Sequence, residues 1–486
     1  MNSTPDNPET GSLPDASTSS SPSGAPGSNT PAFADLALAP EVLANLNQLG
    51  YVTMTPIQAA ALPLALGGHD LIAQAKTGSG KTATFALPLL GKLNARSTRV
   101  QAMVLCPTRE LADQVAKEIR RLARAAENIK VLTLCGGSPI RPQINSLEHG
   151  AHVVVGTPGR LLDHLQRDTL RLEALNTLVL DEADRMLDMG FFDDIVAVAD
   201  ACPPHRQTLL FSATYPDGIA RLAARFLRQP KTVKLEEQHD SGKIRQRFYE
   251  VEHERRLEAV VTLLQHYRPV STLAFCNTRQ QCRDLIDVLQ SHGIHALALH
   301  GELEQRERDQ VLVQFANRSC SVLVATDVAA RGLDIAGLEA VINVDVTPDP
   351  EIHVHRIGRT GRADEDGWAL SLASRADQRR IAAIAEAQNF EPEWHRLDAL
   401  EAISDEPLLP PMATLQILGG RKDKIRPGDV LGALTGEAGF SREQVGKIQV
   451  TDAYTYVAVA RDIVSVAVRK LADGKIKGKK VKVRAL

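Results

Sequence analysis

The chain has 486 residues, 43% of them hydrophobic, and a formal net charge of −3. This length predicts two to four domains with buried cores. No apolar run reaches the 18 residues that a membrane span needs, and we expect no signal peptide. The six cysteines lack Cys-x-x-Cys spacing. They are typical of reduced thiols in a cytoplasmic protein rather than of metal ligands.

The charge is distributed unevenly along the chain. Residues 411–486 contain 15 Lys and Arg against 7 Asp and Glu, a net charge of +8, which leaves −11 for the remainder. A small basic segment on an acidic body suggests a polyanionic partner for that segment.

The N-terminal half begins with a polar tail. Residues 1–31 are rich in Ser, Pro, Thr, Asn and Gly, so we expect them to be disordered. From 32 to 230, short apolar runs alternate with helical patterns, which predicts βαβ units around a parallel sheet. The expected strands are 71–73, 103–105, 131–134, 153–155, 178–180 and 208–211.

The C-terminal half repeats this alternation after a break. The polar segment 231–243 is predicted to be a linker. A second alternating block spans 244–398, and its expected strands are 272–275, 296–299, 322–325 and 340–344. Residues 399–412, with three prolines, form a second predicted linker before a small domain at 413–486. The chain is therefore expected to be an α/β protein with two tandem parallel-sheet domains and a small α+β domain.

A phosphate loop is indicated at Ala75-Lys76-Thr77-Gly78-Ser79-Gly80-Lys81-Thr82, between a predicted strand and a predicted helix. Ala75 stands where the usual pattern has Gly. Gly78 and Gly80 allow backbone N–H groups to surround a phosphate at the N-terminus of the helix. Lys81 is expected to reach the β- and γ-phosphates, and the Thr82 hydroxyl to bind Mg²⁺. The sequence therefore predicts a nucleoside triphosphate site.

An acidic cluster follows the apolar run 178–180. Asp181 is placed to hold Mg²⁺ directly or through water. Glu182 could orient and deprotonate an attacking water. Such a cluster alone is often a solvated loop, but beside a phosphate loop it indicates hydrolysis of the nucleotide.

Together with Ala183 and Asp184, these motifs resemble those of the DEAD-box RNA helicases of superfamily two, from Phe33 to about residue 397. The resemblance implies two RecA-like domains and an RNA-dependent ATPase that uses ATP and Mg²⁺. Phe33, Tyr51 and Gln58 match the adenine-reading motif of the family. Ser212, Ala213 and Thr214 match the motif that couples the nucleotide to RNA, although a helix N-cap would use the same residue types.

The run from His355 to Arg362 resembles the sixth motif of the family. By this resemblance Arg359 and Arg362 act as arginine fingers, His355 helps to hold the attacking water, and Asp334 reaches the ribose. The phosphate loop and the fingers lie in different domains, so hydrolysis is expected to need domain closure. RNA bound across both domains would favour the closed state.

The resemblance also assigns RNA contacts, mostly groups that suit phosphates and sugars and do not read sequence. In the first domain they are Pro107, Thr108, Arg109, Gly136, Gly137, Thr157, Pro158, Gly159 and Arg160. In the second they are Asn277, Thr278, Arg279, Gly301, Gln305, Arg308, Thr326 and Asp327. We therefore expect the core to bind RNA of any sequence.

The C-terminal domain shows an RRM-like βαββαβ pattern, with strands at 413–418, 447–451, 454–460 and 479–485 and helices at 428–437 and 461–472. Alternation places Tyr454, Tyr456, Lys480 and Lys482 on an open sheet face, where aromatic rings stack on bases and cations bind phosphates. An ordinary solvated sheet face with core tyrosines fits the same pattern. The RRM signature is poorly matched, since Asp452 and Ala453 stand where Lys or Arg and Gly belong, so a different surface of the domain is also a candidate for RNA. An alternative phosphate-binding edge consists of Lys475, Lys477, Lys479 and Lys480.

A DEAD-box core followed by this domain resembles the bacterial DbpA subfamily. The resemblance implies a monomeric ATP-dependent RNA helicase, not bound to membranes, that unwinds short duplexes. Its C-terminal domain would select a 23S rRNA hairpin on pre-50S particles during large-subunit assembly. The alternatives are a general DEAD-box helicase with a nonspecific basic tail and an ATP-gated RNA clamp. The complete hydrolytic set disfavours a clamp that never turns over.

Overall fold

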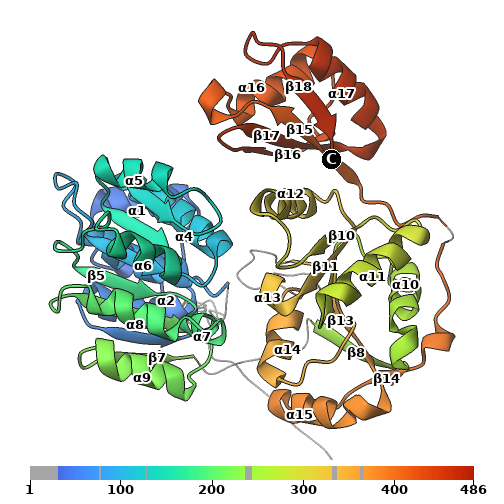
Figure 1. Cartoon of the computed structure of the whole chain (residues 1–486), viewed down its shortest axis with the longest axis horizontal. Helices are drawn as coiled ribbons and strands as arrows, with labels where there is room; N and C mark the ends of the chain where they lie inside the picture. The colour runs from blue at the N-terminus through green and yellow to red at the C-terminus, as the bar shows by residue number, and fades with distance from the viewer. Residues whose placement is uncertain are drawn as a thin grey trace, which may run out of the picture.

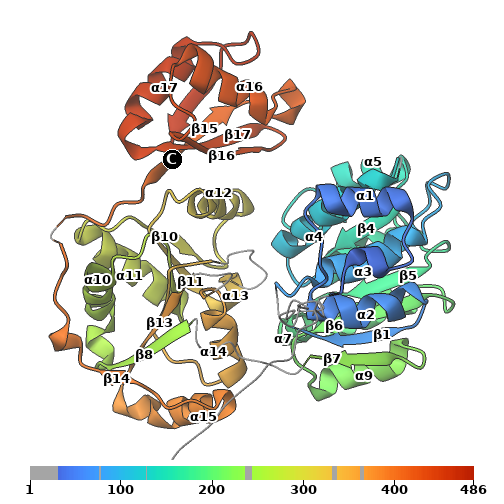
Figure 2. The same ribbon diagram turned by 180° about the vertical axis from the view of Figure 1, so that it is seen from behind.

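The computed structural model describes residues 31–75, 78–126, 128–235, 244–330, 337–361, 366–404 and 406–486. The predicted disordered tail therefore lies almost entirely outside the described residues. Two α/β domains lie side by side, and the small C-terminal domain lies above the second of them, next to α12 (Figures 1 and 2). Among the described residues, no helix is long and apolar enough to cross a bilayer.

Domain 1 is built around a seven-stranded parallel sheet. In spatial order its strands are β3 (Val131–Leu134), β4 (Val153–Gly156), β2 (Ala102–Leu105), β5 (Thr177–Leu180), β6 (Gln207–Ser212), β1 (Leu71–Gln74) and β7 (Lys231–Lys234). Strands β2, β4, β5 and β6 are buried along their whole length, as expected where helices cover both faces of a parallel sheet.

Two layers of helices cover this sheet. One core contains side chains of α1 (Pro40–Gln48), α2 (Pro56–Leu66), α3 (Lys81–Gly91) and α4 (Arg109–Leu122). The other contains side chains of α6 (Pro158–Gln166), α7 (Ala183–Asp188), α8 (Phe192–Asp200) and α9 (Asp217–Phe226), while α5 (Arg141–Glu148) packs at its edge. The phosphate loop, the acidic cluster and residues 212–214 follow β1, β5 and β6, which are neighbours in the sheet, so these segments meet at one edge.

Helix α4 shows how the sequence positions the predicted RNA contacts. The Thr108 hydroxyl caps the helix by accepting a hydrogen bond from the Leu111 N–H group at 3.3 Å. Leu111, Val115 and Ile119 recur at helical spacing and are buried in the core, which fixes the orientation of the helix. Arg109 begins α4 and therefore lies at the carboxyl end of β2.

Domain 2 repeats the architecture. Its seven parallel strands, in spatial order, are β10 (Ala296–Leu299), β11 (Val322–Thr326), β9 (Thr272–Cys276), β12 (Ala340–Asn343), β13 (Gly367–Ala373), β8 (Ile244–Glu250) and β14 (Trp394–His395). Helices α10 (Arg256–Tyr267) and α11 (Arg279–Ser291) cover one face. Helices α12 (Gln305–Ala316), α13 (Asp327–Ala330) and α15 (Gln378–Gln388) cover the other, and α14 (Pro350–Ile357) contacts α15.

The C-terminal domain has an antiparallel sheet in the order β16 (Val445–Val450), β17 (Tyr454–Ala460), β15 (Met412–Leu418) and β18 (Lys482–Ala485). Its helices are α16 (Pro427–Gly432), which continues as a short π-helical turn at Ala433–Glu437, and α17 (Val464–Asp473). Both helices pack on one face of the sheet around Leu415, Val457 and Val459. The predicted fold class is confirmed for all three domains.

The structure differs from the sequence predictions mainly at the domain boundaries. Strand β7 occupies 231–234, inside the first predicted linker, and pairs with β1. Strands β8 and β13 pair along seven residues but were not among the expected strands. The β8 sequence lacks an apolar run, whereas the largely apolar β13 sequence was overlooked. The second predicted linker packs on domain 2, where Leu408 is buried in the core and Arg268 donates to the Glu406 carbonyl at 2.9 Å. This segment is therefore held against domain 2 instead of hanging free.

Candidate active site and RNA-binding surfaces

The phosphate loop joins β1 to α3. Gly80 has φ +93°, and a Cβ atom there would lie 2.5 Å from Nε2 of Gln58, so this position requires glycine. The Lys81 side chain is buried, and its ammonium group donates to the Ala75 carbonyl at 2.9 Å. The cation predicted to reach the phosphates is thus held inside the loop. Lys76 and Thr77 lie outside the described residues.

Two side chains at the start of α2 form hydrogen bonds with the phosphate loop. The Gln58 amide group donates to the Gly80 carbonyl at 3.1 Å, and its Oε1 accepts from the Thr55 N–H group at 2.9 Å. The Thr55 hydroxyl donates to the Ser79 carbonyl at 2.7 Å. The sequence predicted that Gln58 reads adenine, but it did not predict these hydrogen bonds between α2 and the phosphate loop. The signal for them was the Thr-Pro-x-Gln spacing, which puts both side chains in the first turn of a helix.

The two predicted adenine-facing aromatics lie together in domain 1. The rings of Phe33 and Tyr51 meet edge to face with centroids 5.7 Å apart. Phe33 is 2% exposed, and the Tyr51 hydroxyl donates to Glu118 of α4 at 2.8 Å. In this structure both residues therefore fasten the N-terminal segment to the core.

Asp181, at the end of β5, offers a site for a divalent cation. The side chain is 3% exposed. Burial raises its pKa to about 7, against the opposing effect of the Lys81 charge. Within the described residues, its Oδ1 atom has no hydrogen-bond partner. A buried carboxylate oxygen without a donor, near the phosphate loop, fits a Mg²⁺ ligand.

Glu182 occupies a strained position between β5 and α7. Its φ of +51° is rare for a residue other than glycine, and such backbone strain is concentrated at functional sites. Its side chain is buried, and Oε2 accepts from Arg185 at 2.7 Å. The predicted base is thus fixed by a charged hydrogen bond beside Asp181.

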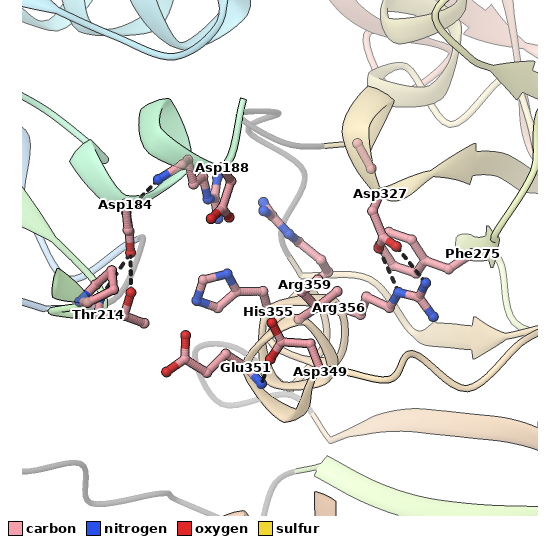
Figure 3. A pocket seen from close by; sticks show the side chains of 14 residues that line it. Asp184, Asp188, Thr214, Phe275, Asp327, Asp349, Glu351, His355, Arg356 and Arg359 are labelled. Carbon is pink, nitrogen blue, oxygen red and sulfur yellow. Dashed lines mark hydrogen bonds and ion pairs between the residues drawn. The ribbon is translucent and has the colours of Figure 1, made fainter. Parts of the chain in front are cut away.

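Asp184 connects the acidic cluster to the predicted coupling segment at the end of β6. One of its carboxylate oxygens accepts from the N–H groups of Ala213 and Thr214, both at 2.9 Å, and from the Thr214 hydroxyl at 3.3 Å. In return, the Ser212 hydroxyl accepts from the Asp184 N–H group at 3.2 Å. These hydrogen bonds link residues 212–214 directly to the acidic cluster (Figure 3).

Domain 2 approaches the same cluster through α14 and the turn after it. His355 and Arg359 line a cavity together with Asp184, Arg185 and Asp188 of domain 1 (Figure 3). Burial and the positive charge of Arg185 lower the His355 pKa to about 4, so its imidazole is neutral at pH 7. One predicted finger is thus placed at the acidic cluster. The other, Arg362, lies outside the described residues, as does Asp334.

Arg356, which sequence reasoning left without a role, lies at the centre of the domain 2 site. Its guanidinium group binds both carboxylate oxygens of Asp327 at 2.7 Å and the Asn277 side chain at 3.3 Å, and it lies over the ring of Phe275. Two predicted RNA contacts are therefore held by one buried cation. The available sequence signal for Arg356 was its position between His355 and Ile357. A buried Arg needs several hydrogen-bond acceptors, so it has to bind other residues around it.

The predicted RNA contacts of the two domains meet across the interface. Arg308 of α12 donates to Glu110 of α4 at 2.5 Å. A Cβ atom on Gly137, which has φ +73°, would lie 3.3 Å from Oε1 of Gln305. Arg160, in contrast, donates to Gln143 and to the Ser138 carbonyl, both at 3.0 Å, and so supports the turn before α5.

The remaining predicted contacts stay close to the ends of the strands from which they were inferred. Pro107 and Thr108 precede α4, Gly136 follows β3, and Thr157, Pro158 and Gly159 open α6; in domain 2, Thr278 and Arg279 open α11, Gly301 follows β10, and Thr326 ends β11. Arg279 forms an exposed ion pair with Glu302 at 2.9 Å. Their roles toward RNA stay predictions.

The predicted open sheet face of the C-terminal domain is covered, so the prediction of an accessible platform at Tyr456 is wrong. Tyr456 is 4% exposed, and its hydroxyl accepts from Gln416 at 3.2 Å. On the same face, Thr414 contacts the Ser319 hydroxyl at 2.7 Å and accepts from Asn317 at 3.1 Å. This face therefore packs on domain 2.

Two flanking residues complete this contact. Arg306 of α12 lies over the Tyr454 ring, with 5.1 Å between its guanidinium carbon and the ring centroid. Lys480 and Lys482, at the far side of the sheet, stay exposed. The alternation correctly placed one set of residues on the face away from the helices. It could not show that another domain covers them.

Comparison with known proteins agrees with this geometry. Residues 55–222 match the DEAD/DEAH box helicase family, residues 255–364 the helicase conserved C-terminal domain, and residues 414–485 the DbpA RNA binding domain. The chain is 53% identical to ATP-dependent RNA helicase DbpA of Escherichia coli over 449 residues, which cover 92% of this chain and 98% of that protein. This chain belongs to the DEAD-box ATP-dependent RNA helicases of the DbpA type.

The helicase also resembles more distant members of the family. It is 45% identical to DEAD-box ATP-dependent RNA helicase CshA of Geobacillus kaustophilus over 70% of this chain and 73% of that protein. Among solved structures, it is similar to S. cerevisiae Dbp5 bound to RNA and ADP BeF3, with a TM-score of 0.69 and 31% identity over 76% of this chain and 96% of that one. The helicase therefore hydrolyses ATP and binds RNA.

Proposed function

We propose that the C-terminal domain selects a 23S rRNA hairpin and that the core unwinds short duplexes near it, on pre-50S particles during large-subunit assembly. The observation that carries this proposal is the net charge of +8 on residues 411–486, a separately folded unit that matches the DbpA RNA binding domain. The core contacts suit phosphates and sugars, so sequence preference has to come from this unit.

The hairpin is expected to bind at an edge of the C-terminal domain, because its sheet face packs on domain 2. Two basic turns form this edge: 421–426, with Arg421, Lys422, Lys424 and Arg426, and 475–480, with Lys475, Lys477, Lys479 and Lys480. The eight side chains are exposed. The turns are joined where Lys477 donates to the Lys424 carbonyl at 2.7 Å. We call this surface the basic edge, and such clustered cations suit RNA phosphates.

The basic edge extends toward domain 1. Burial lowers the pKa of Arg120 on α4, and the positive charge of Arg421 lowers it further. Asp113 opposes this effect on Arg120 and Asp452 pairs with Arg421 at 2.8 Å, and a phosphate between the two guanidinium groups would be a further anionic partner for both. RNA held at the basic edge can therefore continue toward α4 and the core.

In the core, we assign binding of Mg²⁺ to Thr82 and Asp181 and binding of the phosphates to the loop around Lys81. Mg²⁺ would supply neutralisation of the phosphate charge. Glu182 takes the proton of the attacking water, and Arg359 and Arg362 stabilise the charge that develops on the γ-phosphoryl group.

Closure of the two domains links hydrolysis to RNA. His355 and Arg359 belong to domain 2 and line the same cavity as the acidic cluster of domain 1. Within that cluster, Asp184 is hydrogen bonded to the coupling segment. A strand that contacts both domains stabilises the closed state, and the closed state in turn binds that strand more tightly. Binding of one strand by the closed state competes with base pairing in the duplex. A short duplex has few base pairs to oppose this binding, so it opens.

We further propose that the helicase acts as a cytoplasmic monomer. All six cysteines are unpaired and buried, which suits a compartment that keeps thiols reduced. For Cys320, burial raises the thiol pKa to about 12, so it is protonated and unreactive at neutral pH.

Binding of the full-length helicase to the 23S rRNA hairpin tests the proposed function. A hairpin of equal length with a scrambled loop is the control RNA. The affinity should fall steeply with salt concentration. Lys477→Gln with Lys480→Gln should weaken binding, whereas Tyr456→Phe, inside the docked face, should not. Equal affinity for the two hairpins would instead favour a general helicase with a nonspecific basic tail, the second candidate.

A further inference from the structure

A group of buried charges lies in domain 2 next to the predicted RNA contact Asn277. Arg256, the first residue of α10, is 5% exposed. Its two terminal nitrogens donate to different carboxylates, one to Asp345 at 2.5 Å and the other to Asp377 at 2.6 Å. Asp345 lies just beyond β12, and Asp377 lies in the turn between β13 and α15. One guanidinium group therefore connects three segments of domain 2: the start of α10, the residues after β12 and the turn before α15.

Both carboxylates have further partners. The Ser374 N–H and hydroxyl groups donate to Asp377, each at 3.0 Å, and Arg380 donates to its other oxygen at 3.0 Å. The second oxygen of Asp345 accepts from the Asn277 N–H group at 3.4 Å, and the same N–H group also donates to Oε1 of Gln281 at 3.2 Å. Asp345 thus lies between Arg256 and a segment that is predicted to contact RNA.

From Asp345 the contacts continue into the site. Its backbone carbonyl accepts from Arg356 at 2.8 Å, and the same guanidinium group binds Asp327 and the Asn277 side chain. Arg356 lies on α14, next to His355. A continuous set of hydrogen bonds therefore leads from Arg256 to two predicted RNA contacts and to the helix that carries His355.

Stability alone does not account for this arrangement. Buried ion pairs generally stabilise a fold no better than well-packed apolar residues of similar size, because removing charges from water is costly. A guanidinium group differs in that its planar set of donors fixes the directions of its acceptors. Arg256 therefore fixes the position of Asp345 more strictly than an apolar contact could.

We propose that Arg256 is a positioning residue for the activation of ATP hydrolysis by RNA. By holding Asp345, it keeps Asn277 and Asp327 in register with Arg356, so that RNA contact with the first two stabilises α14 in its catalytic position. The inference rests on the proposed roles of Asn277, Asp327 and His355. It adds a residue that touches neither RNA nor nucleotide.

Asp345→Asn is the sharpest test. Asparagine has the shape of aspartate but only one acceptor oxygen, so it cannot accept from both Arg256 and the Asn277 N–H group. The RNA concentration that gives half-maximal ATPase stimulation should rise about tenfold, within the usual range of coupling between sites. The rate without RNA should stay unchanged, because the nucleotide site is intact. Arg256→Met should have an effect at least as large, and Arg256→Lys should recover part of it.

Arg380→Met is the matched control. It removes a hydrogen bond to Asp377 from a half-exposed side chain and leaves Asp345 untouched, so its half-maximal RNA concentration should equal that of the wild type. Melting temperatures are measured for every variant. A merely structural role would lower the melting temperature and the active fraction but leave the half-maximal RNA concentration unchanged. Should Arg256→Met fail to fold, the isosteric Asp345→Asn still decides the question.

Bulk ribosomal RNA serves as the activator, because it contains targets and non-targets alike and keeps this test separate from the hairpin hypothesis. The role of Arg256 would be overturned if Asp345→Asn had the half-maximal RNA concentration of the wild type. It would also be overturned if Arg380→Met raised that concentration as much as Asp345→Asn does. A wild-type enzyme that bulk RNA does not stimulate would contradict the RNA-coupled hydrolysis on which both proposals rest.

Discussion

Arg308 of domain 2 donates to Glu110 of domain 1 at 2.5 Å, and both side chains are largely buried, with 13% and 16% exposure. Arg308 is one of the predicted RNA contacts, and Glu110 directly follows another, Arg109. Arg308 also donates to the Ala329 carbonyl at 2.7 Å, so it is fixed from its own domain as well. The ion pair joins the two domains beside the predicted RNA path, and we infer that it contributes to the closed state.

Glu110→Gln should therefore weaken closure. The amide keeps the shape of the side chain and one acceptor oxygen but loses the charge that pairs with Arg308, so the hydrogen bond between the domains becomes weaker. Energy transfer between dyes on the two domains, measured with RNA and an ATP analogue, should show a smaller closed fraction. Asp366→Asn, in an exposed pair with Arg245, is the control and should close normally. Normal closure in Glu110→Gln would show that the pair is incidental.

The two side chains that hold the phosphate loop can be separated by their effects on nucleotide choice. Gln58→Ala should weaken ATP binding more than GTP binding, because only adenine offers the edge that the amide matches. Thr55→Val removes the hydrogen bond to Ser79 without affecting base recognition, so it should weaken both nucleotides equally. Dissociation constants for the two nucleotides decide this. Equal losses in both variants would limit Gln58 to a mechanical role.

Much of this architecture follows from the sequence because parallel strands buried on both faces leave long apolar runs. The edge strand β7 and the inner strand β8 were missed, since both have mixed polar sequences without an apolar run. The site motifs were found because Gly78, Gly80 and Lys81 combine in few other contexts. Contacts that depend on the meeting of domains, such as Arg306 over Tyr454 or Arg308 against Glu110, leave no local pattern, because each partner alone looks like a solvated residue.

Acidification should open the domains through His355. Its pKa is about 4 in the closed arrangement and about 6.5 when exposed. Above pH 6.5 the imidazole is neutral in both states. Between pH 6.5 and 4 the open state binds the additional proton, so closure weakens by at most about tenfold per pH unit. The closed fraction at saturating Mg²⁺, followed by energy transfer, should fall below pH 6.5 and recover on return to pH 7.5.

His355→Gln provides the control for this pH dependence. Glutamine does not titrate in that range, so the closed fraction of the variant should be flat between pH 7.5 and 5. A variant that opens on acidification as the wild type does would assign the effect to other groups.

The hydrolytic residues give the largest expected effects. Glu182→Gln should nearly abolish ATP hydrolysis while ATP and RNA still bind, because the water loses its base and the phosphate loop is unchanged. Arg359→Ala should lower the rate by roughly 10³-fold, as found for arginine fingers. Single-turnover hydrolysis and equilibrium binding measure both effects. Near-wild-type hydrolysis in either variant would remove that residue from its assigned role.

The central claim is that the C-terminal domain chooses the RNA on which the core acts. The most direct measurement is the ATPase rate of the full-length helicase as a function of RNA concentration, with the 23S rRNA hairpin and with its scrambled form. We expect the hairpin to give half-maximal stimulation at a concentration lower by about 10³-fold, the lower end of specific over nonspecific recognition of nucleic acids. Lys477→Gln with Lys480→Gln should reduce this advantage. Superimposable curves for the two RNAs would contradict the claim.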